Sequence, residues 1–301
     1  MRRYVHRVRE YHTPLTTDMI GVAQRHWALA GEVHEPPERL LGGEESAAYR
    51  LGRHVVRIGP AWRADAEVEW CHAVAAAAAA RVAEALAPCR TATGSTVARV
   101  ARRPVTVWPF VEGSRGDDRD RGQRAQAADL LARLHDALAG VRLGPRPPAS
   151  APRAEVPDLE DPELDEWLDD FDRAHESRQP LHGDFYGGNV LVREGRIVGL
   201  LDWDEAFVGP PERELAWAAW EWGDGLGTLA LQGARTFIAE YAAAGGPARP
   251  IGGDCLRQLV RQRIRWEVSY ARAAARRGVA LDADDHEYQD RQLEAFRLLG
   301  P

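Results

Sequence analysis

The chain has 301 residues, of which 45% are hydrophobic and 28% are charged, as is ordinary for a soluble globular protein of one large domain or two lobes. Its longest apolar run, residues 73–80, is too short to span a bilayer, and no basic cluster with interleaved aromatic residues points to nucleic acid as a partner. Residues 1–10 lack the apolar core of a secretion signal and the three cysteines are widely spaced, so a cytoplasmic protein without disulfides is expected.

The formal net charge of −7 is unevenly distributed along the chain, and all 39 basic residues are arginine. Arginines outnumber acidic residues over residues 1–150, whereas acidic residues outnumber arginines over residues 151–301. A basic first part suits a polyanion such as nucleotide phosphate, and an acidic second part suits a cationic or metal-bound partner. A surface asymmetry without function is the alternative.

Residues 1–110 have the pattern of a small β-rich lobe. A helix is predicted over residues 16–30, with Thr16, Thr17 or Asp18 as its cap, and an alanine-rich helix over residues 64–87 is predicted to end at Pro88. Glycine-containing turns punctuate the remaining segments in the manner of hairpins. Strands are predicted over residues 39–41, 47–51, 54–58, 97–100 and 106–111.

The rest of the chain is predicted to be mainly helical. Leucines at 130, 131, 134 and 138 recur at helical spacing, and residues 143–153, rich in Pro and Gly, are predicted to form a loop. Leu164, Trp167, Leu168 and Phe171 are predicted to line one face of an acidic helix. Further helices are predicted over residues 124–138, 213–222, 228–243, 254–277 and 284–299. The predicted fold class is therefore α+β, with a small β-rich lobe followed by a larger helical lobe.

Residues 181–192 (LHGDFYGGNVLV) and 199–203 (GLLDW) carry the most informative pattern. Asp184 follows an apolar strand end in a glycine-rich turn, and a predicted hairpin over residues 190–201 returns Asp202 to the neighbourhood of Asn189. Phosphoryl transfer requires a carboxylate near the acceptor hydroxyl and oxygen ligands for Mg²⁺, which these side chains can supply. The simpler alternative is a turn at Asp184 with Asp202 as a strand-end cap.

These residues resemble the aminoglycoside phosphotransferase and choline kinase-like family of small-molecule kinases, which carry HGDxxxxN and then a hydrophobic hairpin ending in Asp and an aromatic residue. Residues 130–135 (LLARLH) and 209–216 (GPPERELA) resemble two further segments of that family. The resemblance implies that Asp184 is the catalytic base and that Asn189 and Asp202 are magnesium ligands.

The resemblance covers about residues 38–222 and also implies a fold. It is the bilobal protein-kinase-like fold, with a small five-stranded antiparallel β lobe and one helix next to a larger, mainly helical lobe. The implied parts are a nucleotide-binding lobe over residues 1–107, a linker over residues 108–113, and a lobe with the catalytic loop and acceptor pocket over residues 114–301. The implied cofactors are ATP, with GTP as the alternative, and Mg²⁺, and Asn189 would also lie at the nucleotide.

Further nucleotide contacts are implied by position in the family pattern. Arg57 stands where the family carries a lysine that contacts the α- and β-phosphates and pairs with a glutamate on the next helix, here Glu67. Arginine suits bidentate phosphate binding, although its planar fork is not equivalent to lysine. Ser46 is a weaker candidate for a phosphate contact. Trp108 and Phe110 lie in the implied linker, either near the adenine or in the core.

Two stretches could frame a cationic acceptor. Residues 155–172 contain many acids and no basic residue, and residues 217–224 combine tryptophans with acids. A solvated helix face and tryptophans packed in the core are the alternatives.

The expected function is ATP- and Mg²⁺-dependent phosphate transfer to a hydroxyl of a small molecule, foremost an antibiotic such as an aminoglycoside or another natural product. The alternatives are a metabolic kinase for choline, homoserine or an amino sugar, and a nucleotide-binding pseudokinase, which the arginine at position 57 suggests. The expected partner is a small-molecule hydroxyl acceptor, cationic if it is aminoglycoside-like. Neither nucleic acid nor a membrane is expected as a partner, and the chain is expected to act as a monomer or homodimer.

Overall fold

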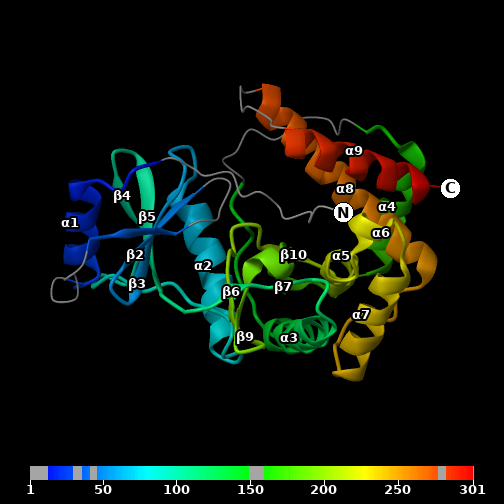
Figure 1. Cartoon of the computed structure of the whole chain (residues 1–301), viewed down its shortest axis with the longest axis horizontal. Helices are drawn as coiled ribbons and strands as arrows, with labels where there is room; N and C mark the ends of the chain where they lie inside the picture. The colour runs from blue at the N-terminus through cyan, green and yellow to red at the C-terminus, as the bar shows by residue number, and fades with distance from the viewer. Residues whose placement is uncertain are drawn as a thin grey trace.

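The computed structural model describes residues 13–29, 36–40, 46–148, 159–175, 177–276 and 283–300. An antiparallel sheet with helices α1 (Thr17–His26) and α2 (Asp65–Ala79) forms one end of the molecule, and a larger group of helices forms the other (Figure 1). The two parts follow one another along the chain. This arrangement confirms the predicted α+β fold class with a β-rich and a helical lobe.

Five strands form the sheet of the β-rich lobe in the order β1-β2-β3-β5-β4, and every neighbouring pair is antiparallel. In β2, Tyr49 and Leu51 are buried while Arg50 between them is exposed, the period of two that is expected when one face of a sheet packs on a core. Val56 and Val107, which face each other across β3 and β5, have no exposed surface. The strands are β1 (Glu38–Leu40), β2 (Ala47–Leu51), β3 (His54–Ile58), β4 (Ala98–Val100) and β5 (Arg103–Pro109).

Helix α1 packs on this sheet through Met19 and Ala23, which belong to the same hydrophobic cluster as the buried strand residues. The Thr16 side chain accepts a hydrogen bond from the Met19 amide at 3.3 Å, so Thr16 is the cap among the three candidates.

Helix α2 lies between the sheet and the helical lobe (Figure 1) and ends at Ala79, not at residue 87 as predicted. The chain leaves the helix because it pairs with β9 (Arg196–Leu200): the Leu200 amide donates to the Glu84 carbonyl at 2.7 Å, and Ala85 bridges Leu200. This tertiary pairing overrides the helix propensity of the alanine-rich segment.

The helical lobe is built on α3, whose leucines at 130, 131, 134 and 138 are all buried. The predicted helix over residues 228–243 starts later than predicted, at Gln232, because Leu229 adopts a left-handed φ of 53° that ends the short helix α6 before it. The helices are α3 (Arg121–Ala139), α4 (Pro162–Ala174), α5 (Pro211–Trp222), α6 (Gly225–Thr228), α7 (Gln232–Ala243), α8 (Gly253–Arg276) and α9 (Ala283–Leu298).

Short strands in the middle of the molecule (Figure 1) position the loops of interest. β8 (Val190–Arg193) and β9 form the predicted hairpin, whose turn residues have φ values of 52° and 73°. β6 (Ser114–Arg115) pairs with β8, and β7 (Gln179–Leu181) pairs with β10 (Phe207–Gly209). Neither of these two pairings was predicted, since each strand has only two or three residues.

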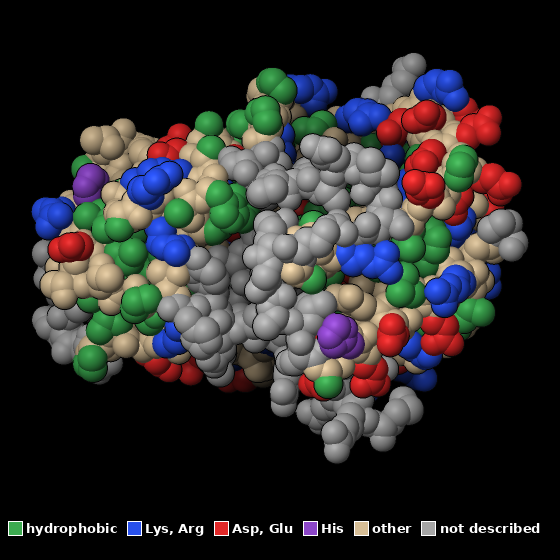
Figure 2. Space-filling model, turned by 90° about the horizontal axis from the view of Figure 1, so that it is seen from above, with side chains coloured by type: hydrophobic (Ala, Val, Ile, Leu, Met, Phe, Trp, Pro, Cys, Tyr) green, Lys and Arg blue, Asp and Glu red, His purple; other side chains and the backbone are tan. Residues whose placement is uncertain are grey.

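Charged side chains of both signs are interspersed over the helical lobe on the face that Figure 2 shows. Among the described residues, the helices lack the length and apolar character that a membrane span requires.

Candidate active site

The loop between β7 and β8 brings Asp184 and Asn189 into contact. The Asn189 side-chain amide donates to the Asp184 backbone carbonyl at 2.9 Å and to its Oδ2 at 2.7 Å. The intervening turn is a 3₁₀ helix, η1 (Gly187–Asn189). Both contacts use Nδ2, so neither of them takes up the amide oxygen of Asn189.

Glu214 of α5 holds the backbone of this loop in place. Its buried carboxylate accepts hydrogen bonds from the backbone amides of His182 and Gly183. Its Oε2 also lies 2.9 Å from Nε2 of His135 on α3, and Nδ1 of His135 lies 2.8 Å from the Tyr241 hydroxyl of α7. Burial alone would raise the pKa of Glu214, but the hydrogen bond and nearby charge of His135 and the Gly183 amide hold it below its usual value. Three helices therefore support the loop through one carboxylate.

Gly183 cannot be replaced without moving the loop. Its φ is +88°, and a Cβ atom there would lie 2.2 Å from the backbone oxygen of Glu205. The close approach joins the Asp184 loop to the segment that follows Asp202.

His182 supports the same junction. Its Nε2 lies 2.8 Å from the Leu201 carbonyl, and its Nδ1 accepts from the Asp184 amide at 3.2 Å. These partners require a neutral ring with the proton on Nε2, and burial lowers the pKa of His182 in agreement. The ring also packs edge-on against Trp203, with centroids 4.6 Å apart.

Asp202 lies next to Asn189, as the predicted hairpin requires. The Leu201 amide donates to the Asn189 carbonyl at 2.8 Å, and Asp202 itself has a left-handed φ of 59°. Nη2 of Arg57, on β3, lies 3.0 Å from Asp202 Oδ1. A non-glycine residue in this backbone region costs free energy, and such residues are concentrated at functional sites.

A second arginine, Arg63, shares a carboxylate partner with Arg57. Nη2 of Arg57 also lies 2.8 Å from Asp204 Oδ2, and Arg63, which precedes α2, binds the same carboxylate oxygen at 2.5 Å. Arg63 further donates to the Asp204 backbone carbonyl at 2.8 Å. Burial opposes ionisation of Asp204, but Arg57 and Arg63 lower its pKa to about 2. Arg63 was not predicted from the sequence, whereas Asp204 was a candidate for metal or substrate contacts, with a solvated turn residue as the alternative.

Glu67, which was expected to pair with Arg57, forms an ion pair with a different arginine. Glu67 is buried on α2 and forms an ion pair with Arg146 at 3.1 Å, and Arg146 also donates to the Asp204 carbonyl at 3.2 Å. The expected pairing of Arg57 with Glu67 is thus replaced by Arg57 with Asp202 and Asp204, and by Glu67 with Arg146. Arg146 lies in the segment predicted as a loop, where no spacing connects it to α2.

The remaining nucleotide-side candidates have defined neighbours. Ser46 is 4% exposed at the start of β2, whereas residues 41–45 before it lie outside the described residues. Trp108 donates to the Thr106 hydroxyl at 3.0 Å. The Arg50 guanidinium lies 4.1 Å from the ring centroid of Phe110, and the Phe110 backbone amide donates to the Arg53 carbonyl. Both aromatic rings are half-buried where the sheet ends.

The environment of Asp184 is strongly acidic. Burial raises the pKa of Asp184 to about 8 against the opposing charge of Arg263, and nearby carboxylates of Asp202, Glu205 and Glu267 raise it further. Burial also raises the pKa of Glu221, with Glu267 acting in the same direction. Arg263 of α8 lies 3.0 Å from Asp184 Oδ1 and was not predicted from the sequence.

The acidic helix α4 is held by arginines of neighbouring helices. Asp165 pairs with Arg265 at 2.6 Å and Asp172 pairs with Arg213 at 2.7 Å. The tryptophans at 217, 220 and 222 are buried, which agrees with the alternative of packing in the core. The acids that lie near Asp184 therefore come from α5, α8 and the segment after Asp202, not from α4.

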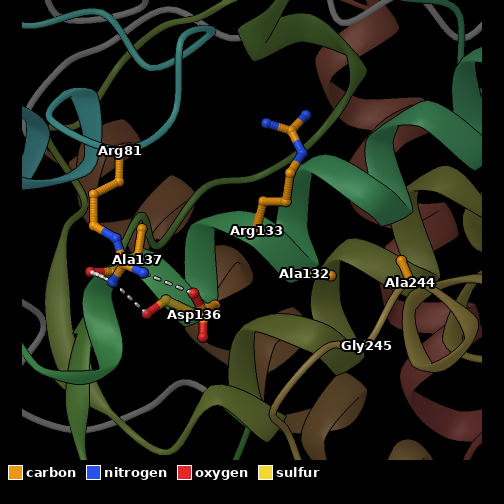
Figure 3. Close-up of a pocket in the computed structure, with 7 residues that line it drawn as sticks. All are labelled: Arg81, Ala132, Arg133, Asp136, Ala137, Ala244 and Gly245. Atoms are coloured by element: carbon orange, nitrogen blue, oxygen red, sulfur yellow. Dashed lines mark hydrogen bonds and ion pairs between the residues drawn. The ribbon is translucent and has the colours of Figure 1, made fainter.

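A depression of about 290 Å³ lies on another part of the surface (Figure 3). Arg81 and Asp136 at its edge form an ion pair at 3.1 Å, and Arg133 pairs with Glu84 and Asp129. It shares no lining residue with the loops around Asp184 and Asp202.

The donor set at Asn189 and Asp202 fits Mg²⁺. One amide oxygen and one carboxylate are hard ligands, and protein-bound Mg²⁺ usually keeps several waters and one or two carboxylates alongside substrate phosphates. Within the described ranges, no three His, Cys, Asp or Glu side chains gather into a metal-binding group, so a site built wholly from such ligands is not present there.

Known proteins resemble this chain in sequence and in fold. The profile of the phosphotransferase enzyme family matches residues 38–259. A segment of 62 residues is 39% identical to hygromycin-B 4-O-kinase of Escherichia coli, and it covers 19% of this chain and 17% of that enzyme.

Solved structures share the whole fold at low identity. A structure of amicoumacin kinase in complex with AMP-PNP, Ca²⁺ and Ami has a TM-score of 0.67 at 14% identity, with 93% of this chain and 92% of that chain covered. A choline/ethanolamine kinase family protein from Mesorhizobium loti has a TM-score of 0.61 at 18% identity, with 96% of both chains covered. A thermostable mutant of the aminoglycoside phosphotransferase APH(4)-Ia in a ternary complex with ADP and hygromycin B has a TM-score of 0.56 at 18% identity, with 94% of this chain and 98% of that chain covered.

Proposed function

The chain belongs to the phosphotransferase enzyme family, and from that premise we propose that it transfers the γ-phosphoryl group of ATP to a hydroxyl of a small molecule. The observation that carries the proposal is the junction of the two loops. Asn189 binds Asp184 through its side chain and the residue before Asp202 through its backbone. This junction brings the proposed base and the two proposed oxygen ligands together.

Each residue has one proposed role in this reaction. Asp184 orients the acceptor hydroxyl and receives its proton, because a carboxylate within hydrogen-bond reach is suited to both tasks. Asn189 and Asp202 would hold Mg²⁺, which neutralises charge on the nucleotide phosphates when bound. Phosphoryl transfer depends mainly on alignment and charge neutralisation, which these fixed side chains supply.

Arg57 is the proposed phosphate contact. Both of its ion pairs within the described residues use Nη2, on Asp202 and Asp204, so the guanidinium is already held at the proposed metal ligand. Its other nitrogens then suit the bidentate geometry of phosphate oxygens. Ser46, Trp108 and Phe110 remain proposed nucleotide contacts, and Glu67 is proposed to act through Arg146. ATP is the proposed nucleotide, with GTP as the alternative.

The proposed acceptor is an antibiotic of the aminoglycoside type or another natural product. A positively charged acceptor would offset the cost of ionising the buried carboxyl groups near Asp184, among them Glu205 and Glu221. Solved structures of similar fold include enzymes that bind hygromycin B and amicoumacin. The likeness to a choline/ethanolamine kinase family protein supports the second candidate, a metabolic kinase for an amino alcohol. We further propose a cytoplasmic monomer or homodimer.

The test is an ATP-consumption screen with Mg-ATP and Mg-GTP against hygromycin B, spectinomycin, kanamycin, choline, ethanolamine and homoserine. We expect turnover with at least one acceptor and its loss in Asp184→Asn and Asp202→Asn. Turnover restricted to choline or ethanolamine would select the metabolic kinase. Nucleotide binding without turnover of any acceptor would contradict the proposal and indicate a pseudokinase.

A further inference from the structure

Arg263 reaches the proposed base from a helix about 80 residues further along the chain. Its Nη1 donates to the Gly183 carbonyl at 3.0 Å, and its Nη2 donates to Asp184 Oδ1 at 3.0 Å. One planar guanidinium thus binds both the side chain of Asp184 and the backbone of the preceding residue. Arginine is suited to this because its donors project in a rigid fork.

The guanidinium is itself tightly held. Its Nε donates to Glu267 Oε1 at 3.0 Å, one turn further along α8. Its carbon lies 5.0 Å from the ring centroid of Trp217 on α5 and 4.7 Å from that of Trp266 on α8, within the range of cation–π contacts. The Arg263 side chain is 19% exposed. These contacts therefore leave the Arg263 side chain little conformational freedom.

Helix α9 fixes Glu267 in turn. Gln292 donates its side-chain amide to Glu267 Oε2 at 2.5 Å, and the Tyr288 hydroxyl lies 3.4 Å from the same oxygen. α5, α8 and α9 therefore combine to hold one guanidinium against the catalytic loop. These contacts hold Arg263 more firmly than the partners of a solvent-exposed ion pair are held.

Arg263 and Asn189 together fix the orientation of the Asp184 carboxylate. Arg263 binds Oδ1, and Asn189 binds Oδ2 at 2.7 Å, so each carboxylate oxygen is held by its own donor. An ionised carboxylate has about four acceptor positions, so two donors still leave room for an acceptor hydroxyl. Without Arg263, Asp184 would face the nearby carboxylates of Glu205 and Glu267 without its nearest positive charge.

We propose that Arg263 is a positioning residue for phosphoryl transfer, which fixes the plane of the Asp184 carboxylate so that it meets the acceptor hydroxyl. This inference rests on the proposed role of Asp184 as the base. It assigns to α8 and α9, outside the recognised motifs, a direct part in setting the geometry of the site. Misplacement of a catalytic group by about 1 Å can reduce a rate by about a hundredfold.

The test compares Arg263→Met with Arg265→Met. Arg265 lies on the same helix and is also buried, but it pairs with Asp165 on α4 and not with the loop. With hygromycin B and water as phosphate acceptors, Arg263→Met should lower kcat by about 30- to 100-fold and change KM for Mg-ATP less than about twofold. Arg263→Lys should recover part of the loss, as should added guanidinium ion with Arg263→Met. Arg265→Met should retain parental kcat in the folded fraction.

The possible results separate this inference from the function it rests on. Parental kcat in Arg263→Met together with an inactive Asp184→Asn would overturn the role of Arg263 and leave the proposed function intact. Full activity in Asp184→Asn would overturn the proposed function. Hydrogen exchange of residues 181–190 supplies a readout that needs no turnover. Exchange should accelerate in Arg263→Met but not in Arg265→Met, and equal exchange in both variants would contradict the inference.

Discussion

Replacement of Glu214 should weaken both the fold and the loop that carries Asp184. Its carboxylate accepts hydrogen bonds from two loop amides, those of His182 and Gly183, and from His135. Glu214→Gln keeps the size of the side chain but converts one of the two acceptor oxygens into a donor. At least one buried donor then loses its acceptor, because the new NH₂ group cannot accept.

The magnitude follows from the number of bonds affected. A hydrogen bond to a charged group contributes about 1.5–3 kcal/mol, and a buried donor left unpaired costs about 1–3 kcal/mol. We therefore expect Glu214→Gln to lower the free energy of unfolding by about 2 kcal/mol, and Glu214→Ala by about 3–5 kcal/mol, as for removal of one partner from a buried pair. The loss should be accompanied by a lower kcat, since Asp184 follows the two amides directly.

Urea unfolding followed by tryptophan fluorescence measures the first effect. Glu212→Gln is the matched control, because Glu212 is buried on the same helix but accepts from the Arg249 amide, away from the loop. It should lower stability without lowering kcat. The pKa of Glu214 is depressed in the folded state, so its stabilisation is present above the ordinary value of 4.5 and is lost as pH falls below it. A Glu214→Gln variant within about 0.5 kcal/mol of the parent at pH 7 would refute the reasoning.

Three further results are expected. The value of kcat/KM for Mg-ATP, which reports the free enzyme, should fall as pH drops below about 8, because the proposed base Asp184, with a pKa of about 8, must be ionised to receive a proton. A flat profile between pH 6 and 9 would contradict this. Arg57→Met should raise KM for ATP by about tenfold or more, because a charge-assisted contact is lost, and Arg57→Lys should be intermediate. An unchanged KM in steady-state assays would contradict the proposed contact of Arg57 with the nucleotide. Gly183→Ala should lower the free energy of unfolding by about 2–4 kcal/mol in urea, because its Cβ meets the Glu205 backbone and its φ is left-handed; parental stability would show that the loop can move.

The sequence predicted local elements and the loops between them better than it predicted their partners. The β8–β9 hairpin follows from apolar strands around Glu194 and Gly195, a signal within a dozen residues. The end of α2 could not be read in the same way, since it is determined by the contact of Glu84 with Leu200. That contact joins positions more than a hundred residues apart.

The charged partners of the site show the same limit. Asp184, Asn189 and Asp202 lie in a recognisable spacing, and the structure brings them together. Arg146 and Arg263 carry no spacing signal, because each reaches its partner only through tertiary packing. In a chain whose basic residues are all arginine, composition also gives no means of choosing among them.

The most direct test of the proposed phosphotransferase is mass spectrometry of the acceptor panel after incubation with Mg-ATP. The account predicts that at least one hydroxyl compound gains the mass of one phosphoryl group with the parental protein. It predicts no gain with Asp184→Asn, with Asp202→Asn or in the presence of EDTA. A phosphorylated product formed equally by Asp202→Asn would contradict the assignment of the metal-binding site, and one formed equally by Asp184→Asn would contradict the assignment of the base.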